Sequence, residues 1–279
     1  MIPTKKDKKY QICTRCVMDT TDPDIFFDVN GICNHCHTYD EQIKDRVFTG
    51  EEGKRKLAEI VHKIKENGKN KEYDCIIGVS GGVDSSFVAY KVKKIGLRPL
   101  AVHLDNGWNS ELAVKNIEQI LNRLDIPLYT HVIDWEEFKN LQLAFLKAST
   151  PDSEIPSDHA ICALLIKIAK KYKVPVITGV NIRTESHLPL AWSQGHIDWR
   201  YIKSIHKKFG KVKLKTFPHL HIWTFLFYIK SGKWIDILDY LDYNKGDAKK
   251  FLTDELCWKD YGWKHHESIY TRFYQGYIL

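Results

Sequence analysis

The sequence lacks any long apolar run. Its 279 residues contain no stretch of 18 consecutive apolar side chains, so no transmembrane helix is expected. The first residues, MIPTKKDKKYQIC, are charged and lack the apolar segment that follows the basic residues of a secretory signal. We therefore expect a cytoplasmic protein with no membrane partner, and in that compartment cysteines stay reduced.

Two widespread nucleotide-binding motifs are also missing. There is no G-x4-G-K-[ST] sequence, which excludes the P-loop with its phosphate-binding lysine, and no G-x-G-x-x-G dinucleotide motif. With 43% hydrophobic residues the chain can still bury a full core, as one large domain or one domain with a small module. The net charge of +7 favours an anionic ligand, or reflects only a solvated basic surface.

Four of the seven cysteines form two C-x2-C pairs near the N-terminus. These pairs are Cys13 with Cys16 and Cys33 with Cys36. Each pair directs two thiolates toward one point, and four thiolates complete a closed tetrahedral Zn²⁺ shell with no position for a reacting water. We therefore predict a structural zinc ribbon whose metal supplies much of its folding free energy. The neighbouring histidines, at positions 35 and 37, are less favoured ligands.

Strand-like and helix-like segments alternate after this module. An amphipathic helix is predicted around Leu57 to Ile64, and strands then alternate with helices from residue 73 to residue 180. This alternation implies right-handed crossovers and a parallel sheet covered on both faces, which binds ligands at the carboxyl ends of its strands. From Tyr201 onward, aromatic residues and lysines at helical spacing predict a helical core, with stacking on RNA bases as the alternative.

The sequence SGGVDSS, residues 80–86, follows the first predicted strand. Gly81 and Gly82 let the backbone approach a ligand closely, and the next helix offers unpaired N–H groups and a positive dipole end to an anion. The serines add hydroxyl donors. Because Asp84 would repel phosphates unless a divalent cation lay between them, we infer Mg²⁺ at this carboxylate.

SGGVDSS at the end of a first strand resembles the PP-loop of the N-type ATP pyrophosphatase superfamily. The resemblance extends to LAVHLDNGWNS, in which Asp105 would lie near the adenosine, and to TGVNIRTES, which is similar to a T-G-x-N-x-x-x-E element. It implies an α/β parallel-sheet fold of the adenine nucleotide alpha hydrolase type. Such enzymes transfer AMP from ATP to a carbonyl or carboxylate oxygen and release pyrophosphate, after which a nucleophile displaces AMP.

Four segments together resemble the N-acetyl sugar amidotransferases: the zinc ribbon, EIPSDHAICALLIKIAKKY, TGVNIRTESHLPLAW and WKHHESIYTRFYQGYIL. The resemblance covers nearly the whole chain and implies the synthase subunit that makes acetamidino sugars for O-antigens of lipopolysaccharide or for flagellin glycans. The enzyme would adenylate the N-acetyl carbonyl of a free or nucleotide-linked sugar, and ammonia would replace the oxygen, because adenylate is the better leaving group. Ammonia would come from a separate glutaminase with a cyclase-like partner. Members continue beyond the last matching motif, so this chain, which stops at Leu279, is expected to be short at its C-terminus.

A PP-loop tRNA-modifying sulfur transferase is the alternative. In such enzymes a cysteine-borne sulfur attacks an adenylated base carbonyl, and the basic composition keeps an RNA substrate open. Cys162 is the candidate carrier, yet a carrier needs a second catalytic cysteine, and Cys75 and Cys257 are expected in a buried strand and in the C-terminal region. Cys162 is therefore expected to be a packed helix residue. A nucleic-acid binder without catalysis ranks last, because it leaves SGGVDSS without a purpose.

The predicted organisation is a zinc-ribbon module (1–45), a helical linker (46–72), a PP-loop ATP-binding domain (73–200) and a helical C-terminal region (201–279). The expected ligands are ATP, Mg²⁺ and Zn²⁺. Catalytic candidates, on segments expected to converge on the reacting group, are Asp84, Asp158, His159 and Glu185. ATP-binding candidates are Ser80, Gly81, Gly82, Val83, Asp84, Ser85, Ser86, Asp105, Thr178, Gly179 and Asn181. By resemblance alone, sugar-binding or partner-binding candidates are His187, Trp192, Lys264, His265 and Glu267.

Overall fold

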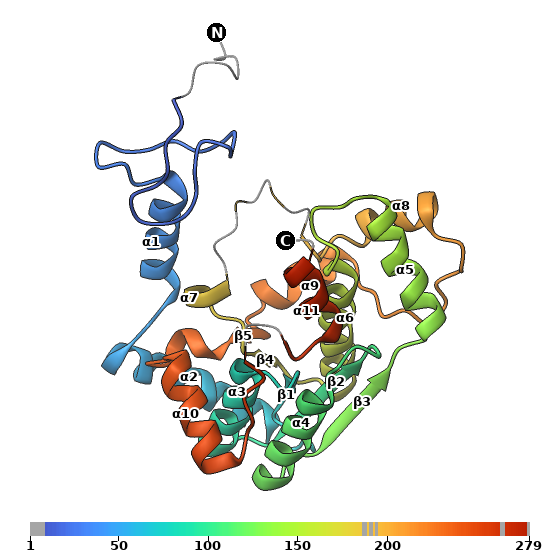
Figure 1. Ribbon diagram of the computed structural model, residues 1–279. Coiled ribbons are helices and arrows are strands. Elements are labelled where there is room, and N and C mark those ends of the chain that lie inside the picture. Colours follow the sequence, from blue (N-terminus) through green and yellow to red (C-terminus); the bar gives the residue numbers. More distant parts are fainter. Residues whose placement is uncertain (1–8, 186–188, 190–191, 193–194, 263–265, 278–279) are drawn as a thin grey trace.

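The computed structural model describes residues 9–185, 189, 192, 195–262 and 266–277. Its centre is a parallel sheet in which the described strands follow the order β3-β2-β1-β4-β5 (Figure 1). The strands are β1 (Cys75–Gly78), β2 (Pro99–Asp105), β3 (Leu128–Val132), β4 (Val176–Thr178) and β5 (Trp234–Asp236). The predicted parallel α/β fold is confirmed.

Helices connect the strands and cover both faces of the sheet (Figure 1). They are α1 (Asn34–Arg46), α2 (Gly50–Gly68), α3 (Val83–Lys94), α4 (Glu111–Leu124), α5 (Trp135–Lys147), α6 (Ile155–Tyr172), α7 (Ile182–Glu185), α8 (Trp199–Phe209), α9 (Ile222–Lys230), α10 (Lys245–Leu256) and α11 (Ile269–Tyr277), with the short 3-10 helix η2 (Ile237–Tyr240) after β5. In the described part of the chain, no helix is long and apolar enough to cross a membrane.

The two faces of the sheet have separate hydrophobic cores. Ile76 of β1 faces a core shared with α5, α6 and α8. Its neighbours Cys75 and Ile77 face the opposite core, shared with α2, α3, α4 and α10. Successive strand residues point to opposite faces, and a strand buried on both faces therefore needs apolar residues throughout. The run CIIG satisfies this requirement and holds β1 at the centre.

The chain order creates a topological switch point at the carboxyl edge of the sheet. The chain moves outward from β1 through β2 to β3, and then returns to place β4 on the other side of β1. The helices after β1 and β4 therefore leave in opposite directions around this position, which is where ligands bind in open α/β sheets. The loop at residues 80–82 follows β1 and lies at this switch point.

The region after residue 200 is part of the same sheet domain and differs from the expected helical extension. β5 pairs with β4 in parallel, in register from Val176 with Trp234 to Thr178 with Asp236. α10 packs against α3, the helix that follows the loop. The signal for β5 is weak because the strand has three residues, which is too short for a clear periodicity.

α9 confirms the predicted helix at residues 222–229, but its burial differs from the predicted core. Within α9 only Tyr228 is fully buried, and Phe225 packs against the core from a partly buried position. Trp223 and Phe227 are 77% and 58% exposed. One side of this helix therefore faces solvent, even though nearly all its residues are apolar.

Candidate active site and metal centre

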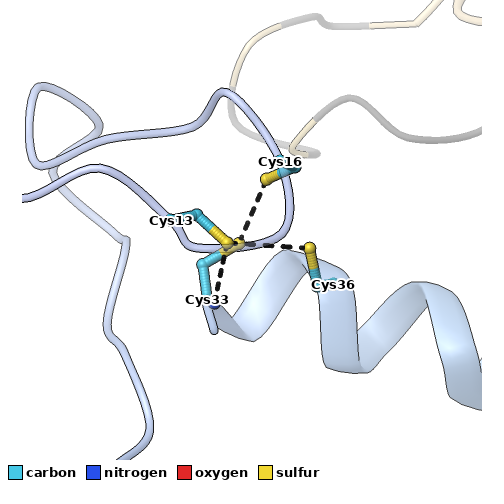
Figure 2. Close-up of side chains that lie close together, drawn as sticks. All are labelled: Cys13, Cys16, Cys33 and Cys36. Atoms are coloured by element: carbon cyan, nitrogen blue, oxygen red, sulfur yellow. Dashed lines mark hydrogen bonds between the residues drawn. The ribbon is translucent and has the colours of Figure 1, made fainter. Parts of the chain in front are cut away.

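The four predicted zinc ligands converge on one point. Figure 2 shows their side chains pointing toward one another, with Cys36 coming from α1 and the others from the preceding turns. Their ligand atoms all lie within 4.8 Å of one another. The Sγ atoms of Cys13 and Cys36 are 3.9 Å apart, and those of Cys16 and Cys33 are 3.7 Å apart.

These distances fit a bound zinc ion and exclude disulfides. A tetrahedral site with Zn–S bonds of about 2.3 Å places its sulfur atoms about 3.8 Å apart, whereas a disulfide bond is about 2.05 Å long. Backbone N–H groups of Arg15 and Cys33 donate to the Sγ atom of Cys13. Burial works against ionisation of this thiol, but these donors lower the pKa of Cys13 to about 6 and favour the thiolate that binds metal.

The neighbouring histidines are engaged elsewhere. The Nε2 atom of His35 lies 2.6 Å from a carboxylate oxygen of Asp22, and that of His37 lies 3.0 Å from Asp28. Both rings therefore act as partners of carboxylates that brace the module. The four cysteines would hold the zinc ion, as predicted.

The loop after β1 is built for close approach of a ligand to the backbone. Gly81 has a φ of +81°, and a Cβ atom there would lie 2.5 Å from the carbonyl oxygen of Ala113 in α4. Only glycine fits this conformation and this space. The Oγ atom of Ser85 accepts a hydrogen bond from the N–H of Ser80 and lies 3.1 Å from the Ser80 hydroxyl, which holds the loop in a tight curve.

The N-terminus of α3 has no capping side chain at its N-cap position. Gly82 is its N-cap and has no side chain to bond the first helical N–H groups. The helix dipole adds positive potential at the same point, so the loop can accept a phosphate group. Val83 and Ser86 are buried at the start of α3, and the hydroxyl of Ser85, in the first turn of this helix, lies beside that of Ser80 in the loop.

The ends of β2 and β4 flank this loop. Asp105, the last residue of β2, accepts hydrogen bonds from the N–H of Gly107 and from the side-chain amide of Asn109. After β4, a Cβ atom on Gly179 would lie 3.0 Å from the carbonyl carbon of Asp84, so this glycine allows the β4 turn to pack on the start of α3. The structure therefore brings three of the predicted ATP-binding segments together.

The T-G-x-N element is tied to β5. The hydroxyl of Thr178 donates to a carboxylate oxygen of Asp236 at 2.6 Å, and burial raises the pKa of Asp236. Asn181 is fully buried, and its amide Nδ2 atom has no hydrogen-bond partner among the described residues. A buried amide of this kind is costly unless a ligand or water completes it, which suits the predicted nucleotide-binding role.

Asp84 has partners that the sequence did not indicate. The hydroxyl of Tyr243 donates to its Oδ1 atom, and the Nζ atom of Lys245 lies 2.9 Å from its Oδ2 atom. Both oxygens of the expected Mg²⁺ ligand are thus engaged by protein groups. This arrangement does not fit Asp84 as an open metal ligand.

His159 occupies a structural position, contrary to the predicted catalytic role. Its ring is fully buried, with Nδ1 2.6 Å from the carbonyl oxygen of His196 and Nε2 accepting from the N–H of Leu220. Trp199 and Phe217 stack on the ring. Burial lowers the pKa of His159 to about 4, so the neutral ring acts as a brace between backbone segments. Asp158, the preceding residue, is exposed near the start of α6.

The remaining predicted residues divide into two groups. Glu267 lies at the loop, since its Oε1 atom would be 3.3 Å from a Cβ atom on Gly82. The side chain of Trp192 is 41% exposed to solvent. Glu185 ends α7. The predicted positions that lie outside the described residues are His187, Lys264 and His265, with the side chain of Glu185.

The C-terminal region supplies site residues that sequence reasoning missed. The indole N–H of Trp258 donates to the carbonyl oxygen of Gly81 at 2.8 Å. The hydroxyl of Tyr261 would lie 3.2 Å from a Cβ atom on Gly82, and burial, followed by the charge of Glu267, raises the pKa of Tyr261. Asn244 before Lys245 indicates a helix start, but no sequence pattern places that helix beside α3.

Comparison with known proteins gives partial matches, and no family model matches the chain. The chain is 31% identical over 100 residues to a tRNA-specific 2-thiouridylase of Campylobacter jejuni (strain RM1221), covering 34% of this chain and 29% of the relative. It is 36% identical over 64 residues to a tRNA(Ile)-lysidine synthase of Chlamydia pneumoniae, covering 22% and 20% of the two chains. The chain thus matches less than a third of the length of these two relatives.

Among solved structures, an NH3-dependent NAD synthetase from Campylobacter jejuni subsp. jejuni NCTC 11168 overlaps with a TM-score of 0.36 and 17% identity, over 77% of this chain and 99% of the other. The sequence relatives, together with SGGVDSS at the first turn of a doubly wound parallel sheet, place the chain in the PP-loop ATP pyrophosphatase superfamily.

Proposed function

We propose that the protein is an ATP-dependent enzyme that transfers AMP to a carbonyl oxygen of its substrate and releases pyrophosphate. The observation that carries this proposal is the loop after β1. Its glycine backbone at Gly81 and the start of α3, which has no side-chain cap at Gly82, would form a phosphate cradle at the switch point of the strand order. Magnesium would accompany ATP and offset the charge of its phosphates.

The chain's own groups suggest how the nucleotide lies. The phosphates would contact the loop N–H groups and the hydroxyls of Ser80 and Ser85, while Asp105 at the end of β2 marks the adenosine side. The carbonyl oxygen of the substrate would attack the α-phosphorus, and the bond to the β-phosphate would break. The helix dipole of α3 favours the negative charge of the departing pyrophosphate.

We further propose that the substrate is an N-acetylated sugar and that ammonia displaces AMP. A carbon–nitrogen bond then forms, the carbon–oxygen bond to AMP breaks, and an acetamidino group results. The support is the resemblance of the segments around the loop, the T-G-x-N element and the C-terminal motif, which includes Glu267 beside Gly82. Ammonia would reach the site from a separate glutaminase subunit with a cyclase-like partner.

A direct test measures pyrophosphate release from ATP and Mg²⁺ at high ammonium concentration. UDP-N-acetyl sugars and free N-acetylated sugar acids are compared with bulk tRNA, and Gly81→Ala serves as the inactive control. We expect release only with an acetylated sugar, and a product whose mass is lower by the difference between O and NH. Release that depends on tRNA instead would overturn the sugar assignment.

Transfer of sulfur to tRNA is the second candidate, because two observations favour a tRNA substrate. The partial relatives named above are tRNA-specific enzymes by name. In addition, residues 199–216, which include α8, contain seven basic side chains and no acidic one. All seven are exposed: Arg200, Lys203, Lys207, Lys208, Lys211, Lys213 and Lys215. Such a surface suits a phosphate backbone.

The cysteines outside the zinc cluster argue against sulfur transfer. Cys162 is buried in α6, and burial raises the pKa of its thiol, which disfavours the reactive thiolate. Cys75 begins β1, at the end of the strand opposite the loop, and Cys257 lies at the C-cap of α10 beside Arg123. The sugar amidotransferase therefore remains the leading proposal.

A further inference from the structure

One edge of the parallel sheet is open. β3 stands at the end of the strand order, and in the described part of the chain it pairs with β2 alone (Figure 1). The N–H of Ala101 donates to the carbonyl oxygen of Pro127, and the N–H of Ile133 donates to that of Asp105. In a parallel ladder, the hydrogen bonds from one strand to one neighbour come from alternate residues. The odd-numbered residues of β3 therefore direct their N–H and C=O groups toward β2.

The even-numbered residues of β3 direct their N–H and C=O groups outward, away from β2. These residues are Leu128, Thr130 and Val132. All three side chains are exposed, that of Leu128 at 44% and that of Val132 at 70%. A row of outward N–H and C=O groups on an edge strand is a template for another strand. This edge therefore offers backbone hydrogen bonds and apolar side chains at the same positions.

The opposite edge of the sheet is protected against such pairing, whereas β3 is not. β5 has three residues, begins directly after Lys233 and ends on Asp236. Short edge strands and charged side chains are usual means of preventing edge-to-edge pairing. β3 has five residues, and the segment 126–133 contains no Lys, Arg, Asp, Glu or Gly. Its single proline, Pro127, lies before the strand, so β3 itself carries none of these protections.

The chemistry of β3 is symmetric about Thr130. An antiparallel pair of two copies, centred on this residue, would place Thr130 opposite Thr130 of the second copy. Leu128 would stand opposite Val132 of the second copy, and the reverse. Threonine pairs are favourable cross-strand neighbours, and the two apolar pairs would remove exposed apolar surface from water. The strand is therefore complementary to itself.

The carboxylates at the two ends of the strand have partners within each copy. The Nζ atom of Lys93 lies 3.7 Å from a carboxylate oxygen of Asp125, and Asp134 accepts a hydrogen bond from the N–H of Glu137. In a pair centred on Thr130, neither carboxylate would stand directly opposite a carboxylate of the second copy. Like charges directly opposite destabilise a strand pair, so the charges around this edge are compatible with a second copy.

We propose that β3 is an interaction surface for a second copy of this chain, and that two copies pair their β3 strands in antiparallel through Leu128, Thr130 and Val132. The two sheets would join into one continuous sheet around a twofold axis at Thr130. Every outward N–H and C=O group of these residues would then have a partner. Because the axis reverses the strand direction, the two loops after β1 would lie at opposite edges of the joined sheet. This pairing is independent of the reaction at the loop.

Analytical ultracentrifugation of the full-length zinc-loaded protein over a concentration series tests the dimer. We expect the wild type to reach the mass of two chains and Thr130→Pro to stay at the mass of one. Proline removes an N–H that points away from β2, a position at which edge strands accept proline, so the single chain should keep its fold. Circular dichroism and a thermal melt check the fold of the variant.

A charge placed on the same edge tests the surface without changing the backbone. Val132→Lys should weaken dimerisation by about tenfold or more, because a lysine on an edge strand opposes pairing. Phe227→Lys is the matched control, since Phe227 is 58% exposed on α9, which packs against β5 at the other edge of the sheet. This control should dimerise within about twofold of the wild type.

Disulfide cross-linking with oxidised glutathione tests the register. It uses a Cys257→Ala background, because Cys257 is exposed. Thr130→Cys should form a covalent dimer, since the twofold axis would bring its two Cα atoms to about 5.5 Å, within the range of a disulfide. Val132→Cys should not, because the two copies of this residue would be displaced by four positions, or about 14 Å along the strands.

The contrary outcomes are distinct. A wild type that stays at the mass of one chain at every concentration overturns the proposal. A dimer that persists in folded Thr130→Pro and in Val132→Lys, or that is lost in Phe227→Lys instead, places the contact elsewhere and also overturns it. Cross-linking of Val132→Cys without cross-linking of Thr130→Cys would overturn the twofold axis at Thr130.

Discussion

The four-cysteine cluster draws all its ligands from residues 13–36, whereas the loop site draws on segments between Ser80 and Glu267. In the first region, short turns place the sulfur atoms, and one helix, α1, carries the last ligand. In the second region, the ends of three strands, the start of α10 and the chain after α10 must all be in place. The comparison shows that a local site is encoded by spacing, while a distributed site depends on the packing of the whole sheet.

The two regions are also linked by ion pairs of Arg46. Arg46, the last residue of α1, lies 3.4 Å from a carboxylate oxygen of Asp236 and contacts Asp239. Asp236 accepts the hydrogen bond from Thr178, and Asp239 accepts one from the N–H of Ile182. The helix that holds the last zinc ligand therefore contacts the strand ends that support the T-G-x-N element.

Removal of a zinc ligand should produce the largest effect. We expect Cys33→Ala to lose zinc and unfold residues 9–45, because metal binding in such modules is worth about 10 kcal/mol or more of folding free energy. The sheet domain should keep its thermal transition, since it has its own cores. Zinc content by elemental analysis and limited proteolysis check this, with the exposed Cys257→Ala as control. A joint loss of both regions would mean that they fold as one unit.

The next effect tests the distributed site at its tightest point. Gly81→Ala should destabilise the fold by about 3 kcal/mol and abolish ATP binding, because the new Cβ atom meets the Ala113 carbonyl and the backbone has a positive φ. Gly232→Ala is a matched control, since Gly232 also has a positive φ (+66°) but nothing lies within 4 Å of its Cβ position. Denaturant melts measure the free energy of unfolding of both variants, and ATP titration measures their affinity for ATP. Equal losses in the two variants would show that the backbone relieves the clash in Gly81→Ala.

The third effect concerns pH and the brace at His159. The pKa of this ring is lowered to about 4, so the native state holds the neutral form while the unfolded chain takes up a proton near pH 6.5. The contribution of the neutral His159 ring to the free energy of unfolding is complete above about pH 6.5 and is lost as the pH falls toward 4. We expect about 2 kcal/mol less stability at pH 5 than at pH 8 from this group.

His159→Gln should flatten that pH dependence in urea melts between pH 5 and pH 8, because glutamine does not titrate there. The exposed His221→Gln is the control and should retain the wild-type slope. An unchanged slope in His159→Gln would show that another group causes the acid sensitivity. Pyrophosphate release by His159→Gln at pH 8 would further separate the bracing role from catalysis.

The smallest effect is expected at Cys162. Cys162→Ser should keep pyrophosphate release within about twofold of wild type and cost about 1 kcal/mol of stability, because the thiol packs in the core of α6. A folded variant that has lost substrate turnover would instead favour the sulfur-transfer candidate. Cys75→Ser, in the opposite core, is the matched control for burial.

Much of the fold was predictable because its signals are local. The apolar run at β1 and the helical periodicity of α4 each predict the element that the structure contains. The sequence did not predict β5, because this strand has only three residues, Trp234 to Asp236, and a 3-10 helix follows it directly. The sequence places His159 on a segment expected to reach the reacting group, and only the packing of Trp199 and Phe217 around its ring shows a brace.

The sequence by itself determined the zinc cluster and the loop after β1. The spacing of two C-x2-C pairs and the glycines of SGGVDSS constrain the backbone over a few residues, so no distant contact is needed to interpret them. Only the tertiary structure decided the partners of Asp84 and the placement of Lys245 and Trp258 at the loop. Those contacts arise when β5 joins the sheet and α10 packs on α3, and such long-range packing has no fixed sequence spacing.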